Sequence, residues 1–136
     1  MAGLRRRFAG YLVYALVANS IWPAIAGELG FPFDRELLLE AAPLPGSKRV
    51  PILEVAENGA ASIELWCARV QAQATVGGDT ITIVPIKGDR AQCAPEQQNI
   101  DENLLAALML VTNWRRSGDL VELSGTTTLR FRLLTH

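Results

Sequence analysis

The two cysteines of this 136-residue chain bracket two short runs in which apolar and polar residues alternate. Cys67 and Cys93 are 93 − 67 = 26 positions apart. Between them lie residues 69–76, a Gly-Gly-Asp turn at 77–79, and residues 80–84. Such alternation is typical of antiparallel strands that bury one face and expose the other. A bond between the cysteines would tie the two ends of this hairpin together, so the rest of the fold has to form around it.

The first 26 residues have the three parts of a secretory signal. Three arginines at 5–7 give a positively charged start, residues 11–25 are mostly apolar, and residues 24–26 read Ala-Ile-Ala, a small-x-small cleavage site. An uncut membrane anchor is the alternative, but Pro23 interrupts the apolar run and leaves it short for a bilayer. We expect cleavage after Ala26, which leaves 136 − 26 = 110 residues. Residues 27–136 then form one domain in the periplasm or outside the cell, touching the membrane only transiently through the signal.

Export bears on the state of the two cysteines, because disulfides persist outside the cytoplasm. We expect one disulfide between Cys67 and Cys93, with two buried free thiols as the alternative. Closing a loop of roughly 25 residues stabilises a fold by about 3–4 kcal/mol in the chain-entropy account. The spacing does not fit a Cys-x-x-Cys redox or metal motif, and no histidine lies nearby. We therefore expect no metal and no cofactor.

Turn signals and alternation indicate further strands on both sides of this hairpin. Residues 27–34 are expected to be a loose lead-in, and residues 35–42 a strand rather than a short helix. Asn58-Gly59 predicts a hairpin turn, because both residue types accept positive φ. Prolines and a glycine make residues 42–48 a loop. The remaining strands are expected at residues 50–55, 62–66, 111–116, 120–123 and 126–134, the last with Leu129, Phe131 and Leu133 facing inward.

The period changes from two to that of a helix after Cys93. An apolar stripe of Ile100, Leu104, Leu105, Leu108 and Val111 predicts one amphipathic helix. Residues 99–102 read Asn-Ile-Asp-Glu, which resembles a capping box with Asn99 as the cap and Glu102 reaching back. Capping explains these acidic residues better than a general acid/base pair does. The fold class is therefore α+β: a mainly antiparallel, twisted sheet of about seven strands with one packed helix.

These motifs resemble the META (HslJ-like) domain family of secreted and envelope proteins. The family has a Gly-Cys-Asn element, a Gly-Asp-x-Leu-Thr hairpin and a Thr-Arg-Met-x-Cys element before its helix. The similar segments here are residues 66–69, 75–82, 89–96, 102–108, 111–114, 118–123 and 128–131.

This chain departs from the family pattern at four positions. Ala68 stands where the family has Asn, Ala72 and Ala74 stand where it has Gly and Tyr, and Asp89 replaces Thr. The resemblance implies an α+β envelope protein, often linked to stress tolerance, with no established catalysis. It implies the fold more firmly than a role for any surface residue.

The residue types argue against several classes of function. The net charge of −1 gives no basic surface for nucleic acid. The only histidine is His136, so a Ser-His or Cys-His arrangement has no base on rigid structure. The chain has neither a glycine-rich phosphate loop nor a metal-ligand cluster. We therefore expect a protein that is not an enzyme.

The remaining expectation is a monomeric envelope module that binds a partner protein or a small ligand. Its candidate surface is the polar stripe Arg69, Gln71 and Gln73 together with Arg90, and the bland alternative is a solvated sheet face. Trp66 and Trp114 are further candidates, for which core packing is the alternative.

An inhibitor of an exported hydrolase, such as a lysozyme or a protease, is a second hypothesis. Residues 44–49, with Lys48 and Arg49, would then form the inhibitory loop.

Export, cleavage and the disulfide make one combined prediction. The protein isolated from the envelope of its own host should have the intact mass of residues 27–136 less two hydrogens. Reduction and alkylation should add two alkyl groups. A full-length mass with two free thiols would overturn both the signal and the disulfide.

Overall fold

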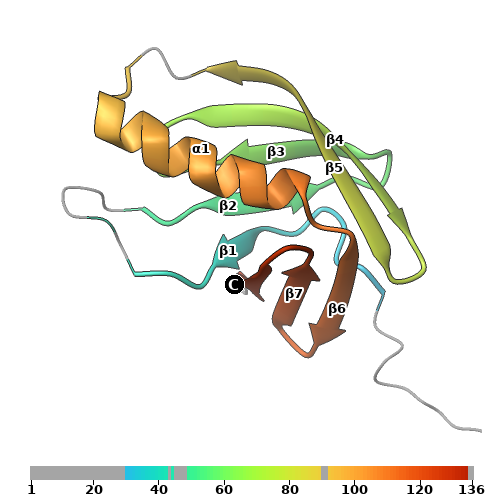
Figure 1. Cartoon of the computed structure of the whole chain (residues 1–136). Helices are drawn as coiled ribbons and strands as arrows, with labels where there is room; N and C mark the ends of the chain where they lie inside the picture. Colours follow the sequence, from blue (N-terminus) through green and yellow to red (C-terminus); the bar gives the residue numbers. More distant parts are fainter. Residues whose placement is uncertain (1–29, 43, 45–48, 90–91, 135–136) are drawn as a thin grey trace, which may run out of the picture.

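The computed structural model of the protein describes residues 30–42, 44, 49–89 and 92–134 (Figure 1). The expected signal segment, residues 1–26, lies outside them, as do Lys48 and Arg90. The described elements are β1 (Leu37–Leu39), β2 (Ile52–Val55), β3 (Ala60–Glu64), β4 (Arg69–Gly77), β5 (Thr80–Asp89), α1 (Pro95–Met109), β6 (Asn113–Ser117), β7 (Leu120–Ser124) and β8 (Thr128–Leu133). In the described part of the chain, no helix is long and apolar enough to cross a bilayer.

The strands pair antiparallel in sequence order and close into a barrel. Tight turns explain the pairing of neighbours in sequence. Gly59 adopts φ 93°, and the side chain of Asn58 accepts a hydrogen bond from the N–H of Ala60 at 2.9 Å, so the predicted hairpin turn is confirmed. Closure comes from the short strand β1, which pairs with β2 on one side and with β8 on the other. The predicted antiparallel sheet with one helix is confirmed, and the closed barrel is a feature that the sequence pattern did not predict.

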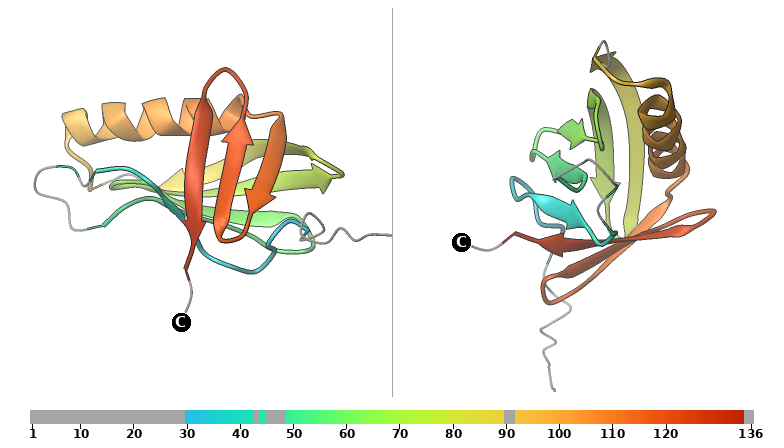
Figure 2. Two further views of the ribbon diagram at one scale, coloured as in Figure 1. Left: turned by 90° about the horizontal axis from the view of Figure 1, so that it is seen from below. Right: turned by 90° about the vertical axis from the view of Figure 1, so that its left-hand side faces the viewer.

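One seam of the barrel is held by very little strand pairing. β5 and β6 pair only at Thr80 and Asn113, with additional backbone hydrogen bonds from Ile81 to Thr112 and from Trp114 to Asp79. Beyond Ile81 the two strands diverge, and α1 packs beside β5 (Figures 1 and 2). The helix therefore closes the side of the barrel that strand pairing leaves open.

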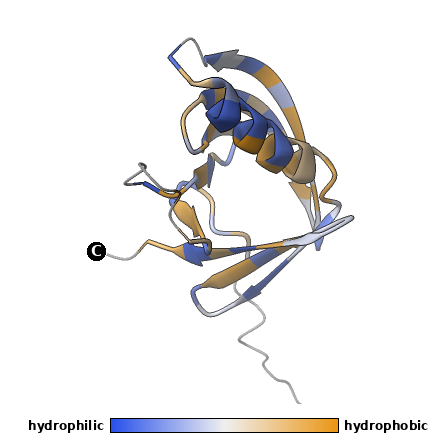
Figure 3. Ribbon diagram, turned by 60° about the vertical axis from the view of Figure 1, so that its left-hand side comes forward, coloured by the Kyte–Doolittle hydropathy of each residue, from blue (hydrophilic) through white to orange (hydrophobic). Residues whose placement is uncertain are grey.

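The interior follows the alternation of the strands, visible as hydrophobic and hydrophilic bands in Figure 3. The predicted inward positions of β8 are confirmed, since Phe131 and Leu133 are buried and Leu129 is half-buried against the core. Among the described residues, one charged side chain is buried with the apolar core. The largest fully buried side chains are Phe131, Leu37, Leu53, Ile63, Leu65, Ile81, Ile83, Leu108, Leu123, Val55, Val121 and Pro51.

Strand β5 continues past its predicted end at Val84. The two-residue turn makes Gly77 and Thr80 a hydrogen-bonded pair. From there along the hairpin, non-hydrogen-bonded and hydrogen-bonded pairs of opposite residues alternate. Pro85, opposite Ala72, then falls where an N–H would point away from β4, so its missing donor costs no ladder bond. Ile86 follows as the extra residue of a β-bulge.

Helix α1 begins earlier than predicted. Its first residue is Pro95, and the Asn99 cap is wrong: Asn99 lies inside the helix and is exposed. Proline suits the first helical position, where its fixed φ helps and its missing N–H has no intrahelical partner. The side chain of Gln97 accepts a hydrogen bond from the N–H of Ala94 at 3.2 Å. This earlier start places the acidic residues Asp101 and Glu102 inside the helix rather than at its cap.

The expected loose lead-in is partly core. Phe31 is only 8% exposed, and its ring contacts Phe33 at 5.1 Å and Trp114 at 5.3 Å between centroids. The contact with Trp114 is edge-to-face, a favourable geometry for aromatic pairs. The segment before β1 therefore packs on the start of β6.

This packing predicts a measurable loss of stability for Phe31→Ala. Removing a mostly buried ring should lower the free energy of unfolding by about 3 kcal/mol. The half-buried neighbour supplies the matched control, Phe33→Ala, for which we expect a smaller loss. Urea unfolding monitored by circular dichroism measures both. A loss below about 1 kcal/mol for Phe31→Ala would mean that the lead-in is not part of the core.

Candidate functional site

A buried carboxylate binds the turn between β3 and β4, residues 65–68. Asp101 is 3% exposed and accepts hydrogen bonds from three consecutive backbone N–H groups. Trp66 donates at 2.8 Å, Cys67 at 3.1 Å, and Ala68 at 2.7 Å. Both carboxylate oxygens take part, so this buried acceptor group has backbone donors on each oxygen. The predicted capping role of Asp101 is therefore wrong: it fixes a turn that lies far away in sequence.

An arginine holds the same turn from its carbonyl side. The guanidinium of Arg49 donates to the carbonyl oxygens of Trp66 at 3.3 Å and Cys67 at 2.8 Å. It also lies 3.7 Å from the carboxylate of Glu64. The turn thus has its N–H groups bound by Asp101 and two of its carbonyls bound by Arg49.

The expected disulfide links this turn to the segment before α1. Cys67 and Cys93 are bonded in the structure, which confirms the pairing. Their sulfur atoms and a carboxylate oxygen of Asp101 lie within 4.8 Å of one another, a grouping that by distance alone resembles a metal site. Here the sulfurs are bonded to each other and the carboxylate accepts backbone hydrogen bonds, so these groups act as structural links.

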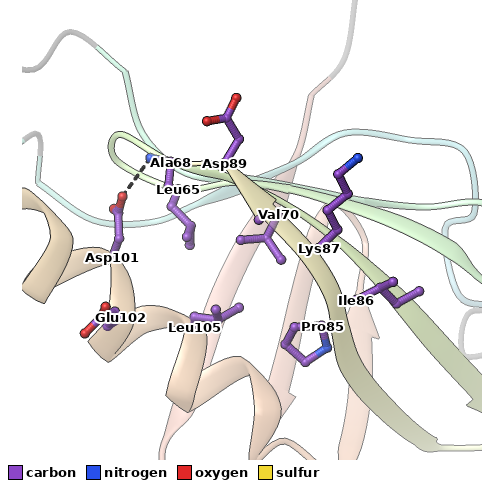
Figure 4. A pocket seen from close by; sticks show the side chains of 11 residues that line it. Leu65, Ala68, Val70, Pro85, Ile86, Lys87, Asp89, Asp101, Glu102 and Leu105 are labelled. Atoms are coloured by element: carbon purple, nitrogen blue, oxygen red, sulfur yellow. Dashed lines mark hydrogen bonds between the residues drawn. The ribbon is translucent and has the colours of Figure 1, made fainter. Parts of the chain in front are cut away.

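A groove lies between α1 and β5, next to the turn. We call it the α1–β5 groove; its cavity volume is about 200 Å³. Figure 4 shows Leu65, Val70, Pro85 and Leu105 converging on it, whereas Lys87 and Asp89 point away. The surface inside the groove is therefore largely apolar. Its lining residues are Leu65, Ala68, Val70, Pro85, Ile86, Lys87, Gly88, Asp89, Asp101, Glu102 and Leu105.

The predicted polar stripe lies on a different face. Arg69, Gln71 and Gln73 are all exposed on the outer side of β4. They line two open depressions of about 380 and 460 Å³ over β2 to β5, and Arg90 lies outside the described residues. Their lining mixes charged and amide side chains with apolar ones such as Ile63, Val70 and Ala72. The stripe is thus exposed as predicted, and the α1–β5 groove, whose surface is more apolar, lies elsewhere.

The two predicted tryptophans do not join the stripe. Trp66 is 8% exposed within the β3–β4 turn, where it is part of the packing. Trp114 is half-buried on β6 against Phe31, and its indole N–H is the one buried side-chain polar atom without a hydrogen-bond partner in the described part of the chain. A buried indole N–H usually has a hydrogen-bond partner, so Trp114 is an exception to that rule.

One described group has a clearly shifted pKa, and it lies on the barrel exterior. A hydrogen bond from Arg115 at 2.5 Å lowers the pKa of Glu122 on β7, with Arg130 adding a smaller attraction at 3.5 Å. Shifted pKa values are common at functional sites, but an exposed cross-strand ion pair accounts for this one. It does not mark a site.

Sequence reasoning missed the α1–β5 groove because its walls come from distant segments. Leu65, Val70 and Leu105 each matched a core position in the local pattern. One signal was present: Val84 and Ile86 are apolar residues on both sides of a proline, at the end of an otherwise polar-faced run. Alternation places both residues on the outer face of β5, where Val84 is 54% and Ile86 67% exposed, so two apolar side chains on an exposed face were the signal.

The fold and the site together define a small disulfide-linked antiparallel β-barrel whose helix closes one seam. The model of the META domain family matches residues 36–135, and the chain belongs to this family, as its motifs predicted. No curated protein matches the sequence. An NMR structure of a protein matches with a TM-score of 0.54 and 15% identity, over 73% of this chain and 88% of the other. At that identity the match shows a common fold alone.

The buried carboxylate predicts a large effect for Asp101→Asn. The amide keeps the shape but turns an NH₂ group toward backbone donors, so two of the hydrogen bonds to the turn weaken or break. We expect a loss of about 2–3 kcal/mol in the free energy of unfolding. The control Glu96→Gln removes an exposed acid from the first turn of the same helix and should cost under about 1 kcal/mol. Equal losses for the two variants in urea unfolding would contradict this role for Asp101.

Proposed function

We propose that the protein is a non-catalytic module of the cell envelope that binds an apolar group in the α1–β5 groove. The observation that carries this proposal is the groove itself: a hollow with largely apolar walls, held by the Asp101 hydrogen bonds and the disulfide. Apolar concave sites with a few fixed polar groups are the usual form of binding sites. Family membership and the predicted signal support the envelope as the place of action.

The size of the groove favours a small apolar group over a large ligand. Sites for drug-sized ligands enclose roughly 300–1,000 Å³. An apolar cavity of about 150 Å³ holds one benzene ring. At about 200 Å³, the α1–β5 groove suits one large apolar side chain or a short aliphatic group.

The polar groups around the groove support a binding role over catalysis. Both oxygens of Asp101 accept backbone hydrogen bonds, so this carboxylate is poorly placed to accept a substrate proton. Lys87 and Asp89 point away from the groove (Figure 4). Among the described residues that line the groove, none is a nucleophile paired with a base.

The inhibitor hypothesis has less support. Arg49, one end of the proposed inhibitory loop, points back to the turn and donates hydrogen bonds to its carbonyls. Lys48 lies outside the described residues. The inhibitor role stays a prediction, and the groove supports an apolar binding module more directly.

A fragment titration tests the proposal. N-acetyl-leucinamide added to the oxidised protein should shift the backbone amide signals of Val70, Gly88 and Leu105 in NMR spectra, with a Kd in the millimolar range expected for one side chain, about −4 kcal/mol. N-acetyl-glycinamide, which lacks the side chain, should shift none of them.

Matched variants assign the shifts to the groove. Leu105→Trp should fill the groove and abolish the shifts, whereas Ala106→Trp, on an exposed position of the same helix, should leave them unchanged. The proposal fails if N-acetyl-leucinamide gives no saturable shift, or if both variants bind it equally.

A further inference from the structure

The edge of β5 that faces away from β4 has no strand partner over most of its length. β6 reaches it only at Thr80, and the hydrogen bond from Ile81 to Thr112 is the last one at this seam. From 82 to 89, no strand in the described part of the chain pairs with that edge. The α1–β5 groove opens beside this edge, between residues 85–89 and the helix.

The hydrogen-bond pattern of the hairpin shows which backbone groups face the open edge. Along the β4–β5 hairpin, hydrogen-bonded pairs of residues alternate with non-hydrogen-bonded pairs, starting from the hydrogen-bonded pair at the turn. Ile81 belongs to a non-hydrogen-bonded pair, so its N–H points away from β4 and donates to the carbonyl oxygen of Thr112. After the bulge, Lys87 pairs with Gln71 and Gly88 with Val70. Gly88 is therefore again of the outward type. Its N–H and C=O therefore point outward from the open edge, away from β4, where an added extended strand could form hydrogen bonds with them.

Gly88 also explains why the groove is there. It stands opposite Val70, which stands opposite Ile63, and these two side chains are buried. Gly88 has no side chain to continue that apolar row, and the space next to it belongs to the α1–β5 groove. A residue on an added strand, placed opposite Gly88, would point its side chain into this space because side chains of paired residues share a face.

The charged side chains on the outer face of the sheet favour particular residues next to the one opposite Gly88 on an added strand. Asp89 lies opposite Arg69, which lies opposite Glu64, so charges alternate across this row. Lys87 lies opposite Gln71, which lies opposite Ser62, and neither is an acid. An acidic side chain on an added strand would lie beside Lys87 and complement it.

We infer that the partner of this site is an extended segment of another protein that adds as a strand to β5, with an apolar residue opposite Gly88 and an acidic residue beside Lys87. This inference rests on the proposed function, because the apolar anchor occupies the same groove. Backbone hydrogen bonds supply affinity in this mode, and the groove and Lys87 supply selectivity. Pro85 and the bulge at Ile86 confine the pairing to a short stretch around Gly88.

A second copy of this chain fits the edge less well. Antiparallel pairing of two β5 edges around Gly88 would place one glycine opposite the other and leave both grooves empty. It would also bring each Lys87 to an Asp89 that already has Arg69 across the ladder. Self-association is therefore an outcome for the experiment to distinguish.

The probe is the peptide acetyl-Thr-Thr-Leu-Glu-Thr-amide, which, when it pairs antiparallel to β5 with Leu opposite Gly88, places Glu opposite Lys87 and Thr opposite Asp89. It should bind the oxidised protein more tightly than N-acetyl-leucinamide and should slow hydrogen exchange at the amide of Gly88. N-methylation of the central Leu nitrogen removes the N–H that pairs with Gly88 and should abolish the gain. N-methylation of the flanking Glu nitrogen, which faces the other way, is the matched control and should leave binding within about twofold.

Protein variants test the same geometry. A Cβ added at Gly88 would lie 3.5 Å from Val70 Cγ2 and 3.8 Å from the carbonyl oxygen of Arg69, both ordinary contacts. Gly88→Val should therefore fold with an unchanged or higher Tm, fill the groove and abolish peptide binding. Thr82→Val, on the outer face of the same strand, should bind normally. Lys87→Glu should weaken binding about two- to fivefold at low salt and less at high salt.

The outcomes separate the two proposals. Equal binding of the peptide and its N-methyl-Leu analogue, both blocked by Gly88→Val, would overturn strand addition and leave the apolar groove standing. No binding of either the peptide or N-acetyl-leucinamide would overturn both. A dimer in sedimentation that Gly88→Val or Lys87→Glu dissociates would show that a second copy takes the edge, and would also overturn the inference.

Discussion

Three consecutive backbone N–H groups of the β3–β4 turn converge on the carboxylate of Asp101, and the rest of the site depends on this contact. Without an acceptor, those buried donors would each carry a desolvation cost. The carboxylate sits on α1, so satisfying the turn also fixes where the helix lies against the barrel. The disulfide makes a covalent link between the same two regions, and Arg49 binds the opposite side of the turn.

The position of the helix has a consequence at the seam between β5 and β6. With α1 fixed beside β5, the strands need not pair there, and only one residue pair joins them. Leu105 faces Val70 across a narrow apolar space instead of filling it (Figure 4). The groove therefore exists because a polar contact from the middle of the helix fixes its distance from the sheet. Binding sites commonly combine such a rigid frame with an apolar hollow.

The same region has the features that a strand-binding surface requires. A glycine at an outward-pointing ladder position exposes its backbone groups and leaves room for a side chain from elsewhere. Pro85 and the bulge at Ile86 shorten the part of the β5 edge that another strand can reach. Natural sheets use prolines and bulges in this way to prevent non-specific strand pairing. Within the META family, to which this chain belongs, such a site would give a small β-barrel a selective contact with an extended segment.

The sequence by itself determined the strands, the turns and the existence of one helix. Alternation placed β3, β4, β7 and β8 close to their observed ends, and two cysteines in a chain with a predicted export signal predicted the disulfide. These properties are local, because the period of side chains along one element decides which face is apolar. The start of the helix was missed because Asn99 and Glu102 imitate a cap, while Pro95 and Gln97 form the real one.

Only the tertiary structure decided the barrel closure, the role of Asp101 and the groove. β1 joins β2 to β8 across most of the chain, and Asp101 meets the turn at Trp66 from 35 positions away. The periodicity of side chains along one helix or strand does not show which distant N–H groups will face a carboxylate. It also does not show the groove that forms where a helix, rather than a strand, packs beside β5. Those outcomes depend on how the elements pack, where buried polar groups must find partners and apolar walls need not meet.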